Sequence, residues 1–355
     1  MRRAAFLPAL AALALAAGGC TRKATLVQDQ GGSASSVSPD STAQMLHDVQ
    51  QAWDAQSDDA HAATLTLQIV RQELIGLPPA TWGSRTEDLL DSLGVGVETA
   101  GGPCAMMVNV FVRSDPGRGS WPAFFWCDGS NVRMQEVEGR GMRLLGAVSE
   151  TRLESSPNPI PVRVAGLFAR PSGGRQQPVL MAWSRKPKDT RWKLAQTLGA
   201  DSLGGFGTGG FETPGDTVTD LVTRTFQTPR GFEECNTCPH MTREHRFRWR
   251  PSGFQRIYDR DIPSTYATFV RLIEALQHGS PTAAAFVRDP GLIELANQYQ
   301  WDRSKGAWRV APGTEEAGSV LTFFRGSQEA YRVTFEPRDD DWVVNGIQPV
   351  PRAVE

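Results

Sequence analysis

The sequence predicts an α+β protein whose central part is rich in antiparallel strands, and two observations predict this class. Short apolar runs separated by Gly-, Pro- and Asp-containing turns fill the middle of the chain. Amphipathic helical periodicity precedes them and returns after residue 262, ahead of a second group of short strands. The 355 residues therefore suggest two modest domains, 41–262 and 263–355, behind an N-terminal segment.

Residues 1–20 have the composition of an export signal. Two arginines precede a run of Ala and Leu that is too short to span a bilayer, and small residues then lead to Cys20. The ending Ala17-Gly18-Gly19-Cys20 resembles the lipobox of bacterial lipoproteins, although Ala17 stands where Leu is usual. The alternative is cleavage after Ala14-Leu15-Ala16, which leaves Cys20 as an ordinary thiol.

The lipobox resemblance implies that the Cys20 thiol is acylated and that Cys20 becomes the mature N-terminus. Membrane lipid would then hold the protein in the bacterial cell envelope. Thr21 follows the cysteine, which is similar to the pattern that sorts lipoproteins to the outer membrane, where they face the periplasm or the cell surface. Residues 21–40 are rich in Ser and Gly and nearly free of apolar side chains, so we expect a flexible tether.

The cysteine count agrees with export. The chain has five cysteines, and assigning Cys20 to lipid leaves four, an even number in a compartment that favours disulfides. We expect a local disulfide between Cys235 and Cys238. Cys104 and Cys127 then form the other pair, because they lie near the ends of consecutive predicted strands, with Cys127 slightly out of register.

Three helices are predicted in the N-terminal part. The first carries Leu46, Val49 and Trp53 on one face, and the third begins at Ser84 and ends at Gly94. The second covers 61–74, where the alternation of Leu65, Leu67 and Ile69 leaves a strand as the alternative. From Val95 the pattern changes to an antiparallel meander with apolar residues on both faces of many strands. Its predicted strands are 106–113, 123–127, 132–137, 142–148, 162–169, 179–183 and 192–194.

The segment Gly205-Phe206-Gly207-Thr208-Gly209-Gly210 matches the letters of a dinucleotide-binding motif. A dinucleotide site needs a helix that begins at the last glycine, so that its N-terminal amides meet the pyrophosphate. Residues 211–216, Phe-Glu-Thr-Pro-Gly-Asp, cannot propagate a helix. We therefore interpret the glycines as a flexible surface loop.

Three interpretations compete for Cys235-Asn236-Thr237-Cys238-Pro239-His240. A local structural disulfide is favoured, because thiols in an oxidising compartment tend to pair before they meet a metal ion. A zinc site of Cys235, Cys238, His240 and His245 is a weaker alternative. Redox activity is weaker still, because a thioredoxin-type pair needs a helix after its first cysteine, whereas residues 245–250 alternate like a strand, with His, Phe and Trp on one side.

The net charge of −2 gives no long-range field that would attract nucleic acid, so no nucleic-acid partner is expected. One basic stripe interrupts this balance. We expect a solvated face whose charge is balanced by nearby acids, and anionic headgroups or glycans are the alternative partners. The stripe consists of Arg243, Arg246, Arg248, Arg250, Arg256 and Arg260.

Residues 263–355 predict helices followed by strands. A helix starts near Ser264, and Ser280-Pro281 and Asp289-Pro290 start two shorter ones. Strands are predicted around 308–310, 320–324, 331–335 and 342–347. Helices on a curved antiparallel sheet resemble the NTF2-like superfamily. The inward strand positions would be Leu321, Phe323, Tyr331, Val333 and Phe335, of which only Tyr331 can titrate.

The motifs favour a noncatalytic, membrane-anchored envelope lipoprotein that binds a partner protein or a small apolar ligand. No catalytic residue, cofactor or metal is assigned, because no G-x-S-x-G, H-E-x-x-H or other histidine cluster occurs. The alternative is an extracytoplasmic enzyme, either a thiol-disulfide oxidoreductase through Cys235 and Cys238 or an NTF2-like pocket enzyme.

Overall fold

The computed structural model describes residues 24–26, 35–37, 39–55, 58–115, 119–129, 131–152, 160–186, 189–213, 219–311 and 318–351. Helices occur beside a larger share of antiparallel strands, which confirms the predicted α+β class. The chain divides into two compact units, whose boundary lies inside the range 41–262. Unit 1 is Met1–Arg140 with Arg152–Ile160, and unit 2 is Gly141–Thr151 with Pro161–Glu355.

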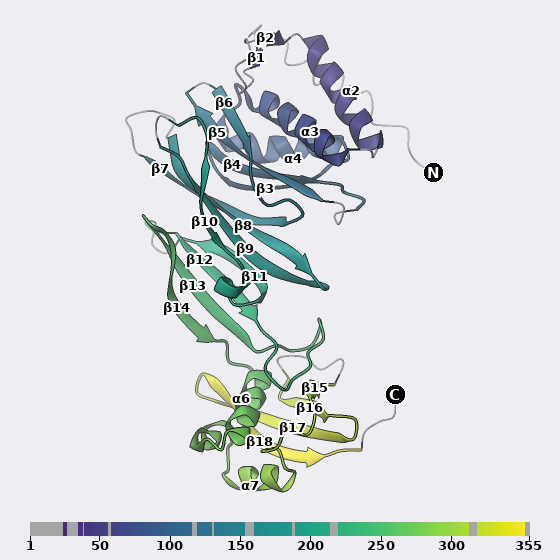
Figure 1. Ribbon diagram of the computed structural model, residues 1–355, viewed down its shortest axis with the longest axis vertical. Coiled ribbons are helices and arrows are strands. Elements are labelled where there is room, and N and C mark those ends of the chain that lie inside the picture. Colours follow the sequence, from purple (N-terminus) through teal and green to yellow (C-terminus); the bar gives the residue numbers. More distant parts are fainter. Residues whose placement is uncertain are drawn as a thin grey trace. The chain divides into compact units, whose positions relative to one another are not determined.

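Unit 1 places helices on one face of a sheet with the strand order β3-β4-β5-β6 (Figure 1). All its strand pairs are antiparallel. Helices α3 and α4 pack on the sheet and α2 packs on α3. The elements are α2 (Pro39–Ala55), α3 (Asp59–Leu74), η1 (Pro79–Thr81), α4 (Trp82–Ser92), β3 (Gly96–Gly102), β4 (Ala105–Phe111), β5 (Ser120–Asp128) and β6 (Asn131–Glu136).

Two very short strands lie within the segment that we expected to be a tether. They are β1 (Ala24–Leu26) and β2 (Ser35–Val37), and they pair antiparallel. A two-stranded ribbon of this size is marginally stable by itself in water. The export signal, including Cys20, lies outside the described residues.

The three predicted N-terminal helices are present, and local side chains fix their ends. The Asp58 carboxylate accepts a hydrogen bond from the His61 amide at 3.0 Å and caps α3. Helix α4 begins at Trp82, ahead of the predicted Ser84, because the 3₁₀ turn at Pro79 already leads the chain into a helix. Gly94, with φ of +70°, follows the end of α4 as predicted.

The central strands β4 and β5 of unit 1 are buried on both faces, as the apolar pattern predicts. Their register pairs Ala105 with Trp126, which places Cys104 directly opposite Cys127. The two sulfurs are 2.09 Å apart, which fits the predicted disulfide. The expected offset of Cys127 is wrong, because the turn between the strands is centred nearer Asp115 than Gly117.

Unit 2 begins with two four-stranded antiparallel sheets of order β10-β9-β8-β7 and β11-β12-β13-β14 (Figure 1). An apolar core joins them, with Leu167 and Leu180 from the first sheet and Leu221 and Phe247 from the second. The elements are β7 (Arg143–Arg152), β8 (Ile160–Ser172), β9 (Arg175–Ser184), β10 (Lys193–Leu198), α5 (Ala200–Leu203), β11 (Phe206–Glu212), β12 (Asp220–Phe226), β13 (Thr242–Arg250) and β14 (Gly253–Asp261).

The glycine-rich segment is a strand, so the expected surface loop is wrong. Residues 206–212 form β11 and pair in unbroken register with β12, from Phe206 opposite Phe226 to Glu212 opposite Asp220. Glycine has a low intrinsic preference for strands, and here the hydrogen bonds to β12 stabilise the extended backbone. The strand continues through Phe211 and Glu212, where a dinucleotide motif would need a helix.

The last part of unit 2 packs helices on a sheet of order β15-β16-β17-β18, and its predicted elements are confirmed (Figure 1). The predicted inward residues Leu321, Phe323, Tyr331, Val333 and Phe335 are all buried. The elements are α6 (Thr265–Gln277), η4 (Pro281–Phe286), α7 (Gly291–Gln298), β15 (Trp308–Val310), β16 (Val320–Arg325), β17 (Glu329–Arg338) and β18 (Asp341–Pro349).

Aromatic rings fill the space between these helices and the sheet. Phe269 of α6 stacks on Phe323 with ring centroids 3.6 Å apart, and it contacts Trp301 and Trp308 edge to face. The Tyr331 hydroxyl donates to the Glu329 carboxylate at 2.8 Å. Burial raises the pKa of Tyr331 to about 12, so the phenol stays protonated at neutral pH.

Candidate functional site

A hollow of about 350 Å³ lies in unit 2, where the β8–β9 turn, strands β11 to β13 and the loop 227–241 meet. This volume suits a small organic ligand, since ligand pockets commonly measure about 300–1,000 Å³. No Asp or Glu is among the described side chains that line it. The lining side chains with charge, an amide or an aromatic ring are Arg175, Arg224, Asn236, His240, Phe206 and Phe226.

Two glycines allow the walls of the hollow to approach one another. Gly174 has φ of +76°, and a Cβ atom there would lie 2.6 Å from the Asn236 amide nitrogen. Gly207 has φ of +141°, and its Cβ would lie 2.2 Å from the Arg224 carbonyl oxygen. Only glycine combines these backbone angles with such close contacts. The glycines of the false dinucleotide motif therefore shape one wall of this hollow.

Arg175, the first residue of β9, is fixed at the hollow from several directions. Its Nε donates to the Asn236 side-chain oxygen at 2.9 Å, and its Nη2 donates to the Glu234 carbonyl oxygen at 2.7 Å. Its guanidinium carbon lies 5.3 Å from the ring centroids of both Phe206 and Phe226. Among the described residues no carboxylate forms an ion pair with Arg175, so its charge is not neutralised there. The other arginine, Arg224, pairs with Glu244 at 3.2 Å.

A buried carboxylate, Glu234, stands behind the hollow. One of its oxygens lies 2.9 Å from His240 Nδ1, and the other accepts the Tyr266 hydroxyl at 2.7 Å. Burial raises the pKa of Tyr266, and the neighbouring Glu234 charge adds to this shift. The phenol therefore remains a hydrogen-bond donor. The His240 ring stacks on Phe226 with centroids 3.6 Å apart, which completes a connected polar and aromatic network.

The histidine–carboxylate pair resembles part of a nucleophilic triad in its connectivity, but no nucleophile among the described residues contacts it. His240 Nε2 is buried and has no hydrogen-bond partner among the described residues, so no Ser, Thr or Cys hydroxyl or thiol is activated by it there. The pair orients the imidazole ring against Phe226. It thereby supports the wall that holds Arg175.

The loop 227–241 also docks on the last core of unit 2. Phe232 and Trp308 form a parallel bridge, in which the Glu233 amide donates to the Trp308 carbonyl at 2.8 Å. The Phe232 side chain belongs to the same apolar core as Tyr266 and Phe269. The position of Glu234 is therefore set by packing on one side and by Arg175 on the other.

The predicted cysteine site lies in this same loop. The Cys235 and Cys238 sulfurs are 2.15 Å apart, which fits a local disulfide. The pair stands in a turn ahead of strand β13 and not at the start of a helix. Among the described residues, no group of three or more His, Cys, Asp or Glu side chains could hold a metal ion. The zinc alternative is not assembled there: both sulfurs are bonded, His240 contacts Glu234, and His245 lies within β13.

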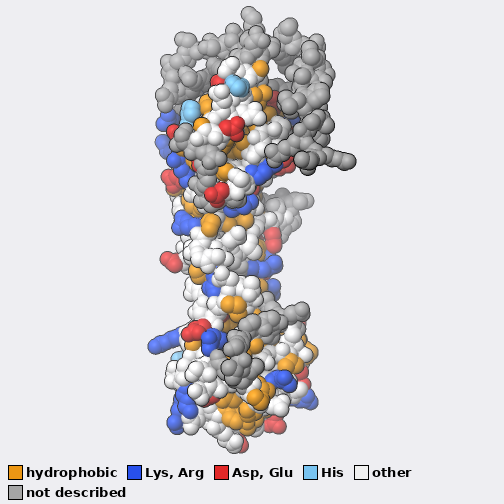
Figure 2. Space-filling view, turned by 90° about the vertical axis from the view of Figure 1, so that its right-hand side faces the viewer, with side chains coloured by type: hydrophobic (Ala, Val, Ile, Leu, Met, Phe, Trp, Pro, Cys, Tyr) orange, Lys and Arg blue, Asp and Glu red, His pale blue; other side chains and the backbone are white. Residues whose placement is uncertain are grey.

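The basic stripe is largely matched by acids, as expected. Arg246 and Arg248 both contact the buried Asp220 carboxylate, and Arg243 contacts Asp261 at 2.7 Å. The Arg248 hydrogen bond lowers the pKa of Asp220 against the opposing effect of burial. On the face shown in Figure 2, Lys and Arg side chains lie among Asp and Glu side chains and form no continuous basic patch.

His245 gives unit 2 an acid-sensitive group. It is 4% exposed, and its Nε2 would lie 2.1 Å from a Cβ atom at Gly204. Burial is the main cause that lowers the pKa of His245, followed by the Arg256 charge. Arg243 also lowers this pKa, whereas Asp259 and Asp261 raise it.

We expect acid to destabilise unit 2 through His245. Its folded pKa lies below its unfolded value of about 6.5, so its full contribution to stability is present above that pH and is lost as the pH falls through the folded pKa. Urea unfolding at about pH 7.5 and about pH 5.5 measures this loss. His245→Gln should reduce the difference, whereas His278→Gln, on the exposed end of α6, should retain it. Equal pH dependence in the wild type and His245→Gln would contradict the assignment.

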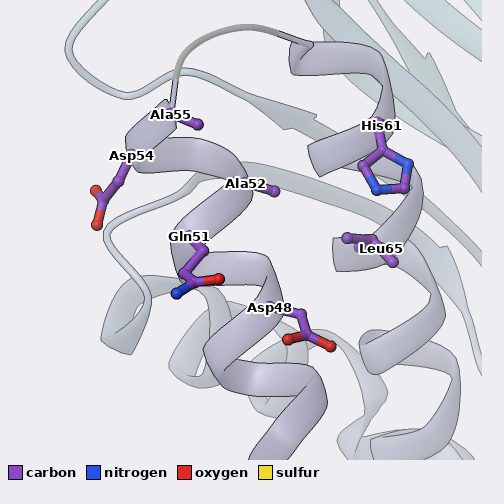
Figure 3. A pocket seen from close by; sticks show the side chains of 7 residues that line it. All are labelled: Asp48, Gln51, Ala52, Asp54, Ala55, His61 and Leu65. Atoms are coloured by element: carbon purple, nitrogen blue, oxygen red, sulfur yellow. The ribbon is translucent and has the colours of Figure 1, made fainter.

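A second hollow lies between α2 and α3 of unit 1 (Figure 3). Figure 3 shows the Leu65 side chain directed toward α2, whereas Asp54 points away from α3. Its polar lining side chains are Asp48, Gln51, Asp54 and His61, and the Asp48 carboxylate accepts a hydrogen bond from Gln44 at 2.7 Å. No convergent set of polar groups is therefore directed at one ligand position there.

The sequence does not point to Arg175, Phe206, Phe226 or Glu234 as site residues. They come from three strands and a loop that are separated along the chain. The pairing of β11 with β12 places Phe206 opposite Phe226, and tertiary contacts of Arg175 join these rings to Glu234. Gly173-Gly174 ahead of Arg175 and the nearby Cys-x-x-Cys segment are the only local signals.

No family model and no curated protein matches the chain. Within the described residues, no helix has the length and apolar character needed to cross a membrane. The side chains that line the hollow beside Arg175 are therefore the basis for assigning a function.

Proposed function

We propose that this protein is a noncatalytic lipoprotein of the bacterial envelope, anchored through acylated Cys20, whose folded part binds a small ligand in the hollow beside Arg175. The observation that carries the binding role is a guanidinium fixed by two hydrogen bonds and two aromatic contacts, without an acidic partner among the described residues. Such a preorganised cation is suited to recognition.

The chemistry around the hollow supports binding over catalysis. A general base must reach the proton that it removes, and His240 Nε2 is buried. Its Nδ1 contacts Glu234, a carboxylate whose side chain is 1% exposed. His240 and Glu234 thus contact each other and do not present a free general base to the hollow. Arg175 is a charged group that lines the space for a ligand.

The anchor rests on the lipobox-like Ala17-Gly18-Gly19-Cys20 and on the pairing of the other cysteines. Four of the five cysteines are joined in two pairs, which leaves Cys20 for the lipid. Thr21 favours the outer membrane as the destination.

We also propose that the last part of unit 2 is an NTF2-like module without a pocket function. Helices followed by a four-stranded antiparallel sheet support the resemblance. The rings of Phe269, Trp301, Trp308 and Phe323 pack together between the helices and the sheet, so large side chains fill that space. Fold resemblance alone does not assign a reaction.

Lipidation is tested by replacing Cys20 with Ser in a bacterial host. We expect the wild-type protein to incorporate labelled palmitate and to fractionate with the membrane, because acyl chains with many buried methylenes are needed for stable anchoring. Cys20→Ser should lose the label and leave the membrane fraction. Cys235→Ser is the control, since it removes a cysteine that lies far along the chain from the signal and should keep the label. Unlabelled wild-type protein, or labelled Cys20→Ser, would rule out the anchor.

A further inference from the structure

We infer that the hollow beside Arg175 binds a small organic monocarboxylate with a flat apolar body. This inference deepens the ligand-binding part of the proposed function and does not depend on the lipid anchor. It rests on the charge of the lining, the orientation of one guanidinium and the aromatic rings beside it.

The charge of the lining selects an anion. Arg175 and Arg224 line the hollow, and no described carboxylate does. Arg224 has an acidic partner, Glu244, at 3.2 Å, and Arg260 shares that carboxylate at 3.5 Å. One guanidinium, that of Arg175, therefore remains without a described acidic partner. A single uncompensated cation matches a monoanion better than a doubly charged phosphate.

The hydrogen bonds of Arg175 select a carboxylate. A guanidinium has five N–H donors arranged as a planar fork. The bonds from Nε to Asn236 and from Nη2 to Glu234 use one edge of this fork. One Nη1 donor and the second Nη2 donor form another edge, which has the spacing of the two oxygens of a carboxylate. Arg175 can thus bind a carboxylate with two parallel hydrogen bonds while it keeps its protein contacts.

The aromatic rings select the body of the ligand. Phe206 and Phe226 lie with centroids 6.0 Å apart, and both line the hollow beside Arg175. A flat apolar group next to the carboxylate would contact these rings and remove apolar surface from water. Thr208 and Thr242 add hydroxyl groups at the same hollow, which can orient a polar substituent.

The disulfide maintains this receptor. Both acceptors that hold Arg175 flank Cys235, one on Glu234 and one on Asn236. The bond from Cys235 to Cys238 closes the turn that contains Asn236. Because the turn is closed, fewer loop conformations compete with the one that positions Arg175. Gly174 permits the approach of Asn236, since any larger residue would meet its amide.

The test uses the full-length protein in a neutral detergent, with para-fluorobenzoate as the probe and fluorine NMR as the readout. We expect millimolar or tighter binding of para-fluorobenzoate and much weaker binding of para-fluorobenzamide, which has the same shape without the charge. Arg175→Gln should weaken the binding of para-fluorobenzoate roughly tenfold or more, because it removes hydrogen bonds to a charged group. Arg175→Lys should recover only part of this loss, because an ammonium lacks the fork.

Two matched controls separate recognition from folding. Arg170→Gln removes an exposed arginine of β8 that does not line the hollow, and it should bind para-fluorobenzoate like the wild type. Gly174→Ala and Gly173→Ala both place a side chain at positive φ in the same turn, but only the former meets Asn236. We therefore expect weaker binding in Gly174→Ala than in Gly173→Ala when thermal unfolding shows that both are folded.

Several outcomes would overturn the inference. These are no binding of para-fluorobenzoate at millimolar concentration, equal binding of the benzamide, or unchanged binding in Arg175→Gln. Displacement of para-fluorobenzoate by equimolar inorganic phosphate would show a general anion site and would overturn the carboxylate assignment. If the wild-type protein takes up no palmitate but binds para-fluorobenzoate, only the proposed lipid anchor is contradicted. If it takes up palmitate but Arg175→Gln binds para-fluorobenzoate as well as the wild type does, only the ligand assignment is contradicted.

Discussion

Replacing Arg325 with Met should lower the free energy of unfolding of unit 2 by about 3–5 kcal/mol, the range for breaking a buried charged network. Arg325 is 2% exposed, and its guanidinium carbon lies 5.4 Å from the Trp308 ring centroid. Met retains an unbranched apolar chain of similar length, so the substitution removes the hydrogen bonds and the charge with little loss of packing.

The size of this effect follows from what Arg325 holds. Its nitrogens donate to the carbonyl oxygens of Tyr299 at 3.0 Å, Gln300 at 2.8 Å and Arg303 at 3.1 Å. These carbonyls follow the end of α7, where the helix leaves its last acceptors without intrahelical donors. Arg325 also lies 3.4 Å from Glu329. Its removal takes this donor from the Tyr299 and Arg303 carbonyls, whereas the Gln300 carbonyl keeps the Arg303 amide at 3.1 Å.

Urea unfolding followed by tryptophan fluorescence measures this loss, because Trp301 and Trp308 lie in the affected core. Arg332→Met is the matched control: Arg332 lies on the neighbouring strand β17, is exposed, and should change stability by less than about 0.5 kcal/mol. A loss below about 1 kcal/mol in Arg325→Met would show that water replaces these bonds.

Removing the Cys104–Cys127 disulfide should lower the stability of unit 1 by about 3 kcal/mol. The two cysteines are 23 positions apart, and the estimate follows from the chain entropy that a loop of this length restores to the unfolded state. Both side chains are buried between the sheet and the helices, so Cys104→Ala with Cys127→Ala avoids placing hydroxyl groups there. Urea unfolding of the double variant and of the oxidised wild type measures the difference.

The short disulfide provides the comparison. Cys235 and Cys238 are three positions apart, and loop entropy assigns their bond a smaller contribution, about 2 kcal/mol. Cys235→Ala with Cys238→Ala should therefore destabilise the protein less than the Cys104 and Cys127 pair of substitutions. The reverse order would mean that local contacts around the short loop, and not chain entropy, determine the effect.

Apolar alternation and turn residues predict most of the strands, because these patterns act locally. The described strands that were not predicted are β1, β2, β3, β11 and β12, and two of them, β3 and β11, share one physical reason. In β3 the glycines Gly96, Gly101 and Gly102 remove the side chains whose alternation marks a strand, and β11 has the same composition. Both strands are stabilised by partners that come later in the chain, β4 and β12. The periodicity of a short segment does not predict such pairing with a later strand.

The candidate site was less predictable than the fold. Cysteine parity and spacing predict the disulfide near the hollow. His240, which the sequence offered as a candidate zinc ligand, lines the hollow. Arg175, however, depends on acceptors about 60 positions away, at Glu234 and Asn236. An arginine after Gly173-Gly174 has no local feature that distinguishes it from other surface arginines. Only the tertiary contacts reveal that it lacks a described acidic partner.

The docking of loop 227–241 limits where the chain can be divided for expression. A fragment starting at residue 263 contains every helix and strand of the last module, yet it omits Phe232 from that module's core and Glu234 from the Tyr266 hydroxyl. A fragment that ends at 262 keeps Phe232 but lacks the core residues that bury it. A useful truncation boundary therefore lies before Phe232, upstream of the point that helix and strand limits alone suggest.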